Sequence, residues 1–386
     1  MRRLRLGMVG GGQGAFIGAV HRIAARLDDQ WELVAGALSS DPARAHASAA
    51  KLGIAAERSY PSFHDMARAE AARDDGIDAV AIVTPNHMHA EPAVAFLRAG
   101  IHVICDKPLA ATAQQADEIA QAVESSGKLF ILTHNYTAYP LIRQARQMVA
   151  EGALGDIRVV QVEYAQDWLT EPASNKQADW RTDPARSGAG GCVGDIGTHA
   201  YNLACFVTGL SADSLAADLQ AFVEGRRVDD NVHVLLRFAG GARGMLWASQ
   251  VAVGNENGLR LRVHGTKGGL EWTQEDPNRM SFTRFGEPKR ILTRGGAGAN
   301  DAGLATLRIP PGHPEGYLEG FATLYSEAAE AILAARAGHA TETLLPGLAE
   351  GLSGMRFIAA CIESSQSNSA WVSLTPRTSF RPAGDE

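Results

Sequence analysis

The first third of the chain alternates short apolar runs with stretches in which apolar residues recur at helical spacing. The runs have the length of buried strands rather than of helices. Alternation of this kind predicts a parallel sheet with helices on its faces. We expect strands at residues 4–9, 31–38, 79–83, 102–105 and 129–133, and helices at 15–27, 42–52, 90–99 and 113–125.

The pattern changes near residue 138. One more helix is expected at 141–151, and after it apolar residues alternate with polar ones, which predicts antiparallel strands with one buried and one solvated face. A glycine-rich stretch at 286–312 is predicted to be a loop, and closing helices are predicted at 317–335 and 346–364. The antiparallel strands are expected at 157–168, 214–223, 231–238, 243–251 and 259–264.

The sequence therefore predicts an α/β protein of two domains, in keeping with its 386 residues. Residues 1–138 would form the parallel domain. Residues 139–386 would form a second α/β domain with a large, mostly antiparallel open sheet, and its C-terminal helices are able to pack back on the first domain.

The composition is that of a soluble globular protein, with 45% hydrophobic and 20% charged residues. The net charge is −7 and no long basic run occurs, so a small molecule is a better partner than nucleic acid or an anionic membrane. No apolar stretch is long enough to span a membrane. The four cysteines show no Cys-x-x-Cys spacing, which favours reduced thiols and a cytoplasmic location.

Residues 10–15 read Gly-Gly-Gly-Gln-Gly-Ala and join the first strand to the first helix. Glycines at this place let the backbone approach a pyrophosphate, whose charge is met by N–H groups at the helix start. The segment therefore predicts a dinucleotide-binding domain. Its register stays open: Gly10, Gly12 and Ala15 match G-x-G-x-x-[G/A], whereas Gly14 and Gly18 would take the later roles in a longer loop.

The end of the second strand bears on the choice of cofactor. A carboxylate there usually binds the ribose 2′-hydroxyl of NAD, and an arginine usually binds the 2′-phosphate of NADP. Here Ser39 and Ser40 occupy the strand end, and Asp41 is predicted to cap the next helix. The sequence leaves both NAD and NADP open, with NAD slightly favoured.

Asp195 and His199 stand four residues apart, directly after a glycine run. In the first turns of a helix they would share one face and could act on one bound molecule. Histidine titrates near neutrality and a carboxylate can orient it or bind a hydroxyl, so the pair suits proton transfer. The alternative is a helix start with an aspartate near its positive end.

Two further segments lie at carboxyl ends of predicted parallel strands, where such sheets bind ligands. They read Thr-Pro-Asn-His-Met-His at residues 84–89 and Asp-Lys-Pro at 106–108. With the glycine loop and residues 190–199, they make the chain resemble the Gfo/Idh/MocA family of NAD(P)-dependent oxidoreductases over nearly its whole length. The resemblance implies an N-terminal Rossmann dinucleotide-binding domain followed by a mostly antiparallel α/β domain.

The resemblance also implies catalytic residues. Lys107 matches the lysine of the family's Glu-Lys-Pro motif, and Asp195 and His199 match its Asp-x-x-x-His pair. One departure is Asp106, where glutamate is usual, which shortens the reach of that carboxylate. The residues expected to contact the cofactor are Gly10, Gly12, Gln13, Gly14, Ala15, Phe16, Ile17, Ser39, Ser40, Arg44, Thr84, Pro85, Asn86, His89, Asp106, Lys107 and Asn135.

A polyhydroxylated substrate is implied as well: a sugar, a sugar derivative or a cyclitol, whose hydroxyl-bearing carbon exchanges a hydride with nicotinamide. His199 would remove the hydroxyl proton and Lys107 would stabilise the charge on that oxygen, although the two could exchange roles. Asp195 would bind a hydroxyl and orient the imidazole. The residues expected to contact the substrate are Lys107, Tyr136, Trp168, Trp180, Arg181, Asp195, His199 and His313.

The two tryptophans could instead pack in the core, because wall and core positions suit them almost equally. The family resemblance further implies a homodimer or homotetramer, formed through the exposed face of the second sheet.

Other interpretations fit the residues less well. A catalytically silent dinucleotide sensor would have no need of Lys107, Asp195 and His199 together. A hydrolase would need a nucleophile, and no Gly-x-Ser-x-Gly turn occurs. His87 and His89 form a His-x-His pair, but cofactor contacts explain this turn, so no metal is expected.

Overall fold

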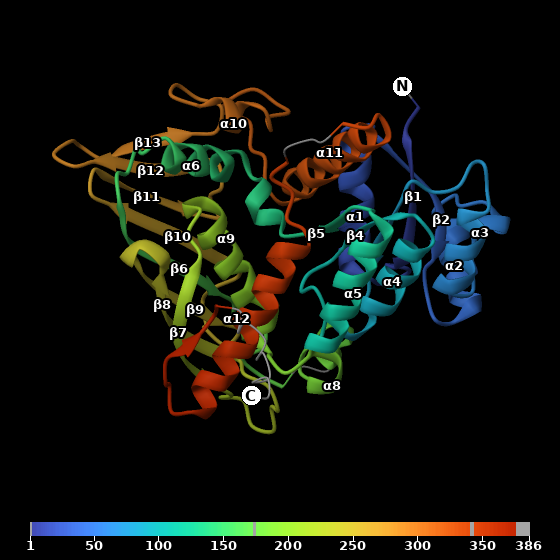
Figure 1. The fold of residues 1–386 in the computed structure, drawn as a ribbon, viewed down its shortest axis with the longest axis horizontal. Helices are drawn as coiled ribbons and strands as arrows, with labels where there is room; N and C mark the ends of the chain where they lie inside the picture. Colours follow the sequence, from blue (N-terminus) through green and yellow to red (C-terminus); the bar gives the residue numbers. More distant parts are fainter. Residues whose placement is uncertain (1, 173–174, 340–342, 376–386) are drawn as a thin grey trace, which may run out of the picture.

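The computed structural model describes residues 2–172, 175–339 and 343–375. Its first sheet is parallel and five-stranded, in the order β2-β1-β3-β4-β5 (Figure 1). All five predicted strands are confirmed, whereas helix α3 was not predicted. The strands are β1 (Leu4–Gly10), β2 (Trp31–Ala37), β3 (Ala79–Val83), β4 (His102–Cys105) and β5 (Phe130–Leu132), and the helices are α1 (Phe16–Leu27), α2 (Pro42–Lys51), α3 (Phe63–Ala71), α4 (Ala90–Arg98) and α5 (Ala113–Ser126).

Local side-chain chemistry fixes where several of these helices begin. Asp41 caps α2 by accepting a hydrogen bond from the Arg44 backbone N–H at 2.9 Å, as its position in the sequence predicts. Ser62 and Thr112 cap α3 and α5 in the same way. The strands carry unbroken apolar runs because helices cover both faces of this sheet.

The second sheet is nine-stranded, in the order β13-β12-β11-β10-β6-β9-β8-β7-β14. The β6 and β9 strands pair in parallel, and the other neighbours are antiparallel, which confirms the predicted fold class. The strands are β6 (Ile157–Ala165), β7 (Ala212–Gln220), β8 (Asn231–Phe238), β9 (Arg243–Ser249), β10 (Gly258–Gly265), β11 (Gly268–Thr273), β12 (Arg279–Arg284), β13 (Arg290–Thr293) and β14 (Val372–Ser373).

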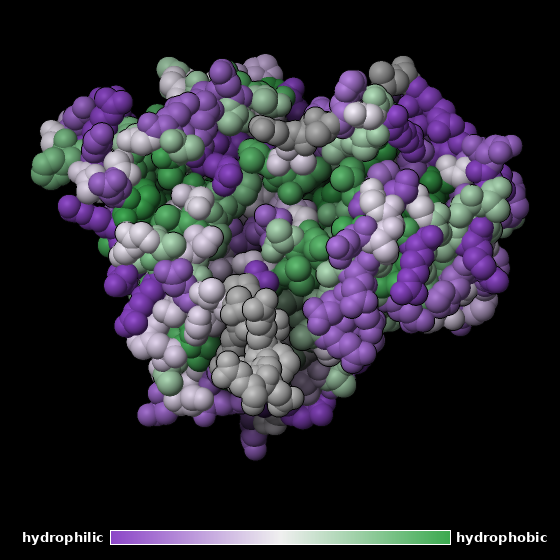
Figure 2. Space-filling model, viewed as in Figure 1, coloured by the Kyte–Doolittle hydropathy of each residue, from purple (hydrophilic) through white to green (hydrophobic). Residues whose placement is uncertain are grey.

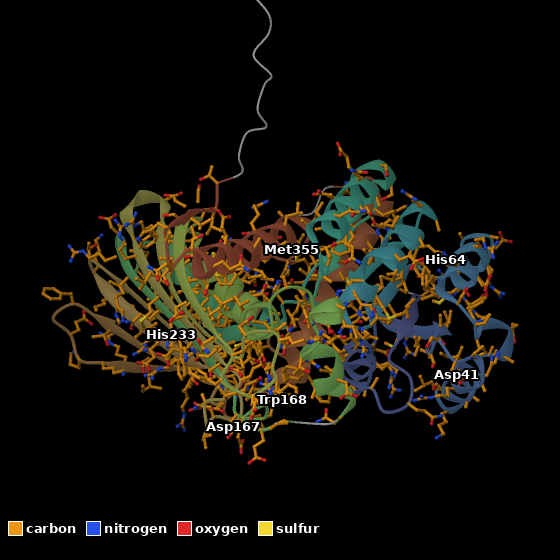
Figure 3. All side chains as sticks on the ribbon, turned by 90° about the horizontal axis from the view of Figure 1, so that it is seen from below. Asp41, His64, Asp167, Trp168, His233 and Met355 are labelled. Carbon is orange, nitrogen blue, oxygen red and sulfur yellow. The ribbon has the colours of Figure 1, made fainter. Side chains whose placement is uncertain are left out.

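One face of the second sheet is covered and the other is open. Helix α9 (Thr198–Thr208) lies on the covered face, with α6 (Pro140–Ala150) packed against it. Along β8 the buried residues Val232 and Val234 alternate with the exposed residues His233 and Leu235. Figure 3 shows His233 on the side of the sheet away from these helices. The alternation in the sequence is therefore the signature of this one-sided burial.

The prediction of a loop at residues 286–312 is wrong in part. The stretch contains β13 and a short helix, α10 (Asp301–Leu304), which Asn300 caps. Strand β13 pairs only with β12 at the edge of the sheet, and α10 packs on α6, where Asn300 donates to the Gln144 carbonyl at 3.0 Å. Elements this short are stabilised by their neighbours rather than by their own pattern. The strands β11, β12 and β14 were also not predicted.

The two long C-terminal helices join the halves of the molecule (Figure 1). Helix α11 (Tyr317–Arg336) packs beside α1, where the Trp31 indole N–H donates to the Tyr325 carbonyl at 2.8 Å. Helix α12 (Leu348–Gln366) contacts β5 and α5 on one side and β7 and α9 on the other. The C-terminal helices α11 and α12 thus complete the helical layer that covers the first sheet.

On the face shown in Figure 2, hydrophilic residues predominate toward the outer rim and hydrophobic residues gather along the hollow between the halves. Among the described residues, we find no helix that combines the length and the apolar character needed to cross a membrane.

Candidate active site

A cavity of about 500 Å³ lies at the carboxyl ends of the parallel strands, where the first domain meets α7 (Lys176–Arg181) and α8 (Pro184–Ser187) of the second. It collects most of the residues that the sequence assigned to cofactor contacts. Those that line it are Gly10, Gly12, Gln13, Ala15, Ile17, Ser39, Ser40, Arg44, Thr84, Pro85, Asn86, Asp106 and Lys107.

Several glycines of the loop and of the start of α1 leave no room for side chains. A Cβ on Gly12 would lie 2.6 Å from the Leu38 carbonyl oxygen, and one on Gly18 would overlap the Cα of Gly11. Gly10 and Gly11 also adopt positive φ angles of 78° and 71°. Gly18 therefore takes the role of close packing between helix and loop. This close packing of Gly18 agrees with the longer register, whereas Gly14 is exposed and has open space around it.

At the tip of β2 the cavity is lined by Ser39, Ser40 and Arg44. The hydroxyl of Ser39 accepts a hydrogen bond from the backbone N–H of Asp41 at 3.1 Å, and the Asp41 carboxylate is occupied in capping α2. No carboxylate among the cavity-lining residues therefore takes the usual place of a ribose ligand at this strand end.

Four predicted cofactor contacts do not line the cavity. Gly14 and Phe16 are exposed, and the Phe16 ring stacks on Tyr317. Asn135 is buried. His89 is buried too, with its ring nitrogens 2.8 Å and 2.9 Å from the carbonyl oxygens of Pro108 and Thr84, so it joins two turns of the site. Burial lowers the pKa of this imidazole.

Helices α7 and α8 form the wall opposite the glycine loop. Asn86 donates through its side-chain amide to the Ser187 carbonyl at 2.8 Å, and a ring nitrogen of His87 lies 3.2 Å from the Arg186 carbonyl. These contacts tie the turn after β3 to the second domain. Trp180 and Arg181 reach the cavity from this wall.

Lys107 and Asp195 meet across the domain boundary. The Lys107 ammonium donates to the Asp195 carboxylate at 2.9 Å and to the Asp195 backbone carbonyl at 2.6 Å. The second carboxylate oxygen accepts from Arg181 at 3.0 Å and from Gln250 at 2.9 Å. Burial opposes the charge of Asp195, but the positive charges of Arg181 and Lys107 outweigh it and hold the pKa of this carboxyl well below its usual range.

Asp195 lies in a π-helical turn, η4 (Val193–Gly197), which runs directly into α9 and His199. Turns of this type are rare and recur at functional sites. The His199 ring packs against Tyr136, with 4.9 Å between ring centroids, and against His134 at 5.4 Å. Burial, together with the nearby Lys107 charge, holds the pKa of His199 well below its usual value. The imidazole is therefore neutral near pH 7.

A hydrogen-bonded row of polar side chains leads from Tyr136 to Trp168. The Tyr136 and Tyr164 hydroxyls are 2.6 Å apart, and Asn257 accepts hydrogen bonds from Tyr164 and Gln166, both at 2.8 Å. Gln166 in turn accepts from the Trp168 indole at 3.0 Å. Figure 3 shows Trp168 near the junction of the two halves.

Arg181 stacks on both tryptophans, with its guanidinium carbon 4.2 Å from the Trp180 ring centre and 5.9 Å from that of Trp168. Together these side chains form a polar and aromatic wall beside Asp195.

The sequence missed Gln250, His134, Tyr164 and Asn257. His134 directly precedes the predicted contacts Asn135 and Tyr136, just after β5. The other three lie in or next to β6, β9 and β10, and only the strand order of the second sheet brings them to the site. His313 is the reverse case. It is exposed, it does not line the cavity, and its backbone carbonyl accepts a hydrogen bond from Arg294.

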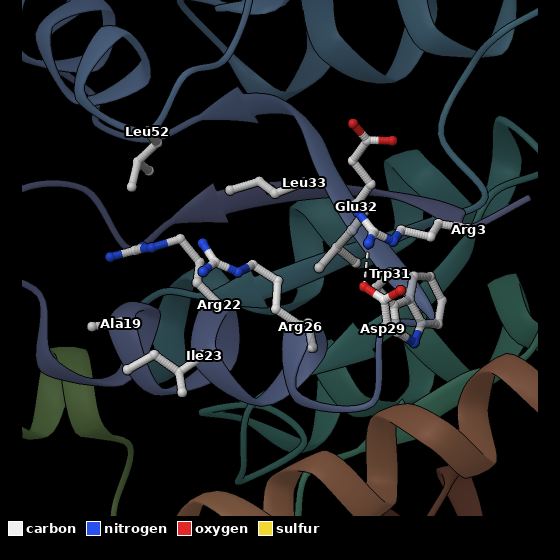
Figure 4. Close-up of a pocket in the computed structure, with 12 residues that line it drawn as sticks. Arg3, Ala19, Arg22, Ile23, Arg26, Asp29, Trp31, Glu32, Leu33 and Leu52 are labelled. Atoms are coloured by element: carbon white, nitrogen blue, oxygen red, sulfur yellow. Dashed lines mark hydrogen bonds and ion pairs between the residues drawn. The ribbon is translucent and has the colours of Figure 1, made fainter.

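A second hollow, of about 680 Å³, lies on the outer side of α1 and β2 (Figure 4). Arg22, Arg26 and Leu33 line it, and Arg3 and Asp29 form an ion pair at its rim. None of the predicted site residues contributes to it. Among the described residues, no cluster of His, Cys, Asp or Glu side chains could hold a metal ion.

Comparison with known proteins gives a family match for each half of the chain. Residues 4–134 match the family model of the oxidoreductase family with an NAD-binding Rossmann fold, and residues 142–271 match the GFO/IDH/MocA C-terminal domain. An oxidoreductase structure from Sinorhizobium meliloti is 57% identical with a TM-score of 0.89, and the match covers 96% of this chain and 100% of that one.

Two relatives carry more specific names. An inositol dehydrogenase homologue from Azotobacter vinelandii, solved with NADH and myo-inositol, is 35% identical with a TM-score of 0.90 over 96% of this chain and 98% of that one. Levoglucosan dehydrogenase of Pseudarthrobacter phenanthrenivorans is 31% identical over 82% of this chain and 83% of its own length. The chain therefore belongs to the Gfo/Idh/MocA family of oxidoreductases.

Proposed function

We propose that this oxidoreductase is an NAD(P)-dependent dehydrogenase that transfers a hydride between a hydroxyl-bearing carbon of a sugar, sugar derivative or cyclitol and nicotinamide. The observation that carries the proposal is the contact of Lys107 with Asp195, at 2.9 Å, at the end of the cavity lined by the glycine loop. His199, on the same helical segment as Asp195, supplies a neutral imidazole.

The residues present fit a dinucleotide. Side chains on Gly10, Gly11 or Gly12 would collide with Thr84, Val83 or Leu38, so bare backbone faces the cavity at the start of α1, where N–H groups can meet a pyrophosphate. When bound, nicotinamide would accept or supply the hydride, which no side chain can do.

In the proposed reaction, the side chains handle the proton and the charge. His199 is neutral at rest, because burial and Lys107 lower its pKa, and we assign its free ring nitrogen the role of accepting the hydroxyl proton. Lys107 donates to the same oxygen as negative charge grows there. Asp195 already accepts hydrogen bonds from Lys107, Arg181 and Gln250, so we assign it the task of holding Lys107 and Arg181 in place.

The substrate class follows from the wall of the site and from the relatives. Arg181 and Tyr136 offer donors and acceptors, and Trp168 and Trp180 offer flat apolar faces, a combination that suits a ring with several hydroxyls. Two relatives are named for a cyclitol and an anhydrosugar. We also propose a cytoplasmic location, because all four cysteines are free thiols.

The proposal predicts reduction of NAD⁺ or NADP⁺ by at least one cyclitol, aldose or anhydrosugar. We expect NAD⁺ to be the better acceptor, since the inositol dehydrogenase homologue is solved with NADH. A panel of such substrates with each cofactor, followed at the absorbance of the reduced nicotinamide, provides the measurement. Tight cofactor binding without turnover of any polyol would favour a dinucleotide sensor instead.

Lys107 and His199 are expected to serve one proton transfer. Each substitution by alanine should reduce kcat on the order of 10² to 10⁴ with little change in cofactor affinity, the usual contribution of a positioned acid or base. The double variant should lose far less than the product of the two losses, because groups that act as a unit are non-additive. Multiplicative losses would show independent roles.

A Gly12→Val substitution should weaken dinucleotide binding by about 10- to 100-fold, because overpacking costs ~1–3 kcal/mol and the new side chain meets Leu38 and Ser48. The matched control is Ala19→Val, which adds the same side chain on the outer side of α1. Calorimetry on both variants measures the effect. Equal affinities would place the phosphates elsewhere.

We propose that the protein forms a homodimer or homotetramer through the open face of the second sheet. Leu235 and Met245 are paired across β8 and β9 and are 54% and 38% exposed, which leaves an apolar surface to cover. Light scattering at micromolar concentration should give a multiple of the 40.9 kDa chain. A Leu235→Lys, Met245→Glu double variant should lower that mass, whereas Ile23→Glu, on the outer face of α1, should not.

A further inference from the structure

Asp229 is a buried carboxylate just before β8. It accepts hydrogen bonds from the start of the segment that carries Asp195 and His199, residues 191–199, which we call the catalytic segment. One carboxylate oxygen accepts from the backbone N–H of Gly191 at 2.6 Å, and the other accepts from that of Val193 at 2.7 Å. Its backbone carbonyl accepts from Cys192 at 2.8 Å. Three successive N–H groups thus bond to a single residue that lies more than thirty positions away in the sequence.

These three N–H groups open the π-helical turn η4, which carries Asp195. Cys192 stands at the N-cap position and makes no side-chain hydrogen bond to the turn. Asp229 therefore supplies from outside the bonds that a local cap usually provides. The approach is close, since a Cβ on Gly191 would overlap the Asp229 carbonyl oxygen. The hydrogen bonds to Asp229, which we call the clamp, therefore require a glycine at position 191.

The charge of Asp229 has no cationic partner. Within the described residues it forms no ion pair, and Arg226 pairs with Asp230 instead. The ionisable groups that interact with Asp229 are Asp230 on the same turn, Cys192 at the start of η4 and Cys361 on α12. Burial, with a smaller effect of Asp230, raises the pKa of Asp229 to about 6. A buried carboxylate without a cation costs stability, so its presence calls for another reason.

We propose that Asp229 is a positioning residue, which acts on the reaction by fixing the turn that carries Asp195. The ionised carboxylate offers an acceptor to each of the two N–H groups. Protonation below pH 6, or replacement by asparagine, turns a donor toward one of them and loosens the turn. The proposal rests on the proposed dehydrogenase function for its catalytic consequence, but the clamp itself can be measured without turnover.

The first test is hydrogen exchange, followed by mass spectrometry on the full-length wild-type protein between pH 5 and 8. After correction for the intrinsic rate, protection of the peptide covering residues 190–197 should fall as the pH drops through about 6. Residues 222 and 223, whose N–H groups bond to Asp230, should keep their protection. Constant protection of 190–197 across this range would overturn the clamp, whether or not a substrate has been found.

The second test uses Asp229→Asn with Asp230→Asn as the matched control. Asp230 is adjacent and also buried, but its carboxylate accepts hydrogen bonds from Phe222, Val223 and Arg226 instead of from the catalytic segment. Asp229→Asn should show the loosened turn at every pH and lower kcat by about 10- to 100-fold, because small displacements of catalytic groups cost that much. Its dinucleotide Kd should stay within a factor of about two, since the glycine loop is not touched.

The pH profile distinguishes positioning from a structural defect. In the wild type, kcat should decline as the pH falls through about 6, whereas Asp229→Asn should lack this limb. Asp230→Asn should retain the limb and move it to lower pH, because the repulsion between the two carboxylates is removed. A wild-type kcat and limb in Asp229→Asn would refute the proposal. If no substrate is turned over, the proposed function fails, and the exchange experiment still decides the clamp.

Discussion

The carboxylate of Asp195 is the point on which the site depends. It accepts hydrogen bonds from Lys107 after β4, from Arg181 on α7 and from Gln250 after β9. These three donors come from three separate parts of the chain and from both domains. A carboxylate holds such a set only if it remains charged, and the two cations keep its pKa low in spite of burial. The position of Lys107 over the cofactor cavity is therefore tied to the assembly of the second domain.

This dependence explains why many residues of the site hold its backbone in place rather than line the cavity. His89 joins the turns after β3 and β4, and Asn86 ties the first of these turns to α8. Both belong to motifs that the family resemblance assigned to the cofactor, but the side chains of both form hydrogen bonds with backbone carbonyls. Rigid backbone at the carboxyl ends of the strands is what allows a bare glycine loop to face the cavity.

Much of the first domain could be predicted from sequence, because parallel strands are unbroken apolar runs and their order follows the alternation with helices. The glycine loop, Lys107 and the Asp195–His199 pair are local motifs, so they too could be found. Gln250, Tyr164 and Asn257 could not, because they reach the site only through the pairing of β6, β9 and β10. The strand β13 and the helix α10 escaped notice because tertiary contacts, rather than their own four-residue patterns, stabilise them.

His313 is a predicted substrate contact that the structure places outside the cavity. A histidine before a long helix looked suited to a polar contact, but the buried ion pair of Arg294 with Glu315 organises this loop and leaves His313 exposed. Its sequence context gave no information about that pair, whose partners are separated by twenty-one positions. A buried charge must be paired, so such a pair determines the conformation of the loop and with it the exposure of the neighbouring polar residues.

The charge balance of the site connects these observations to the proposed chemistry. Lys107 and Arg181 place two positive charges against the one Asp195 carboxylate that they both contact, and His199 is neutral. Such a site favours an oxygen that becomes negative during reaction, and it does so with groups already fixed by hydrogen bonds. A neutral imidazole beside it can take the proton that the oxygen loses. Burial and the nearby Lys107 charge keep this imidazole neutral, because protonating it would add a third positive charge beside Lys107 and Arg181.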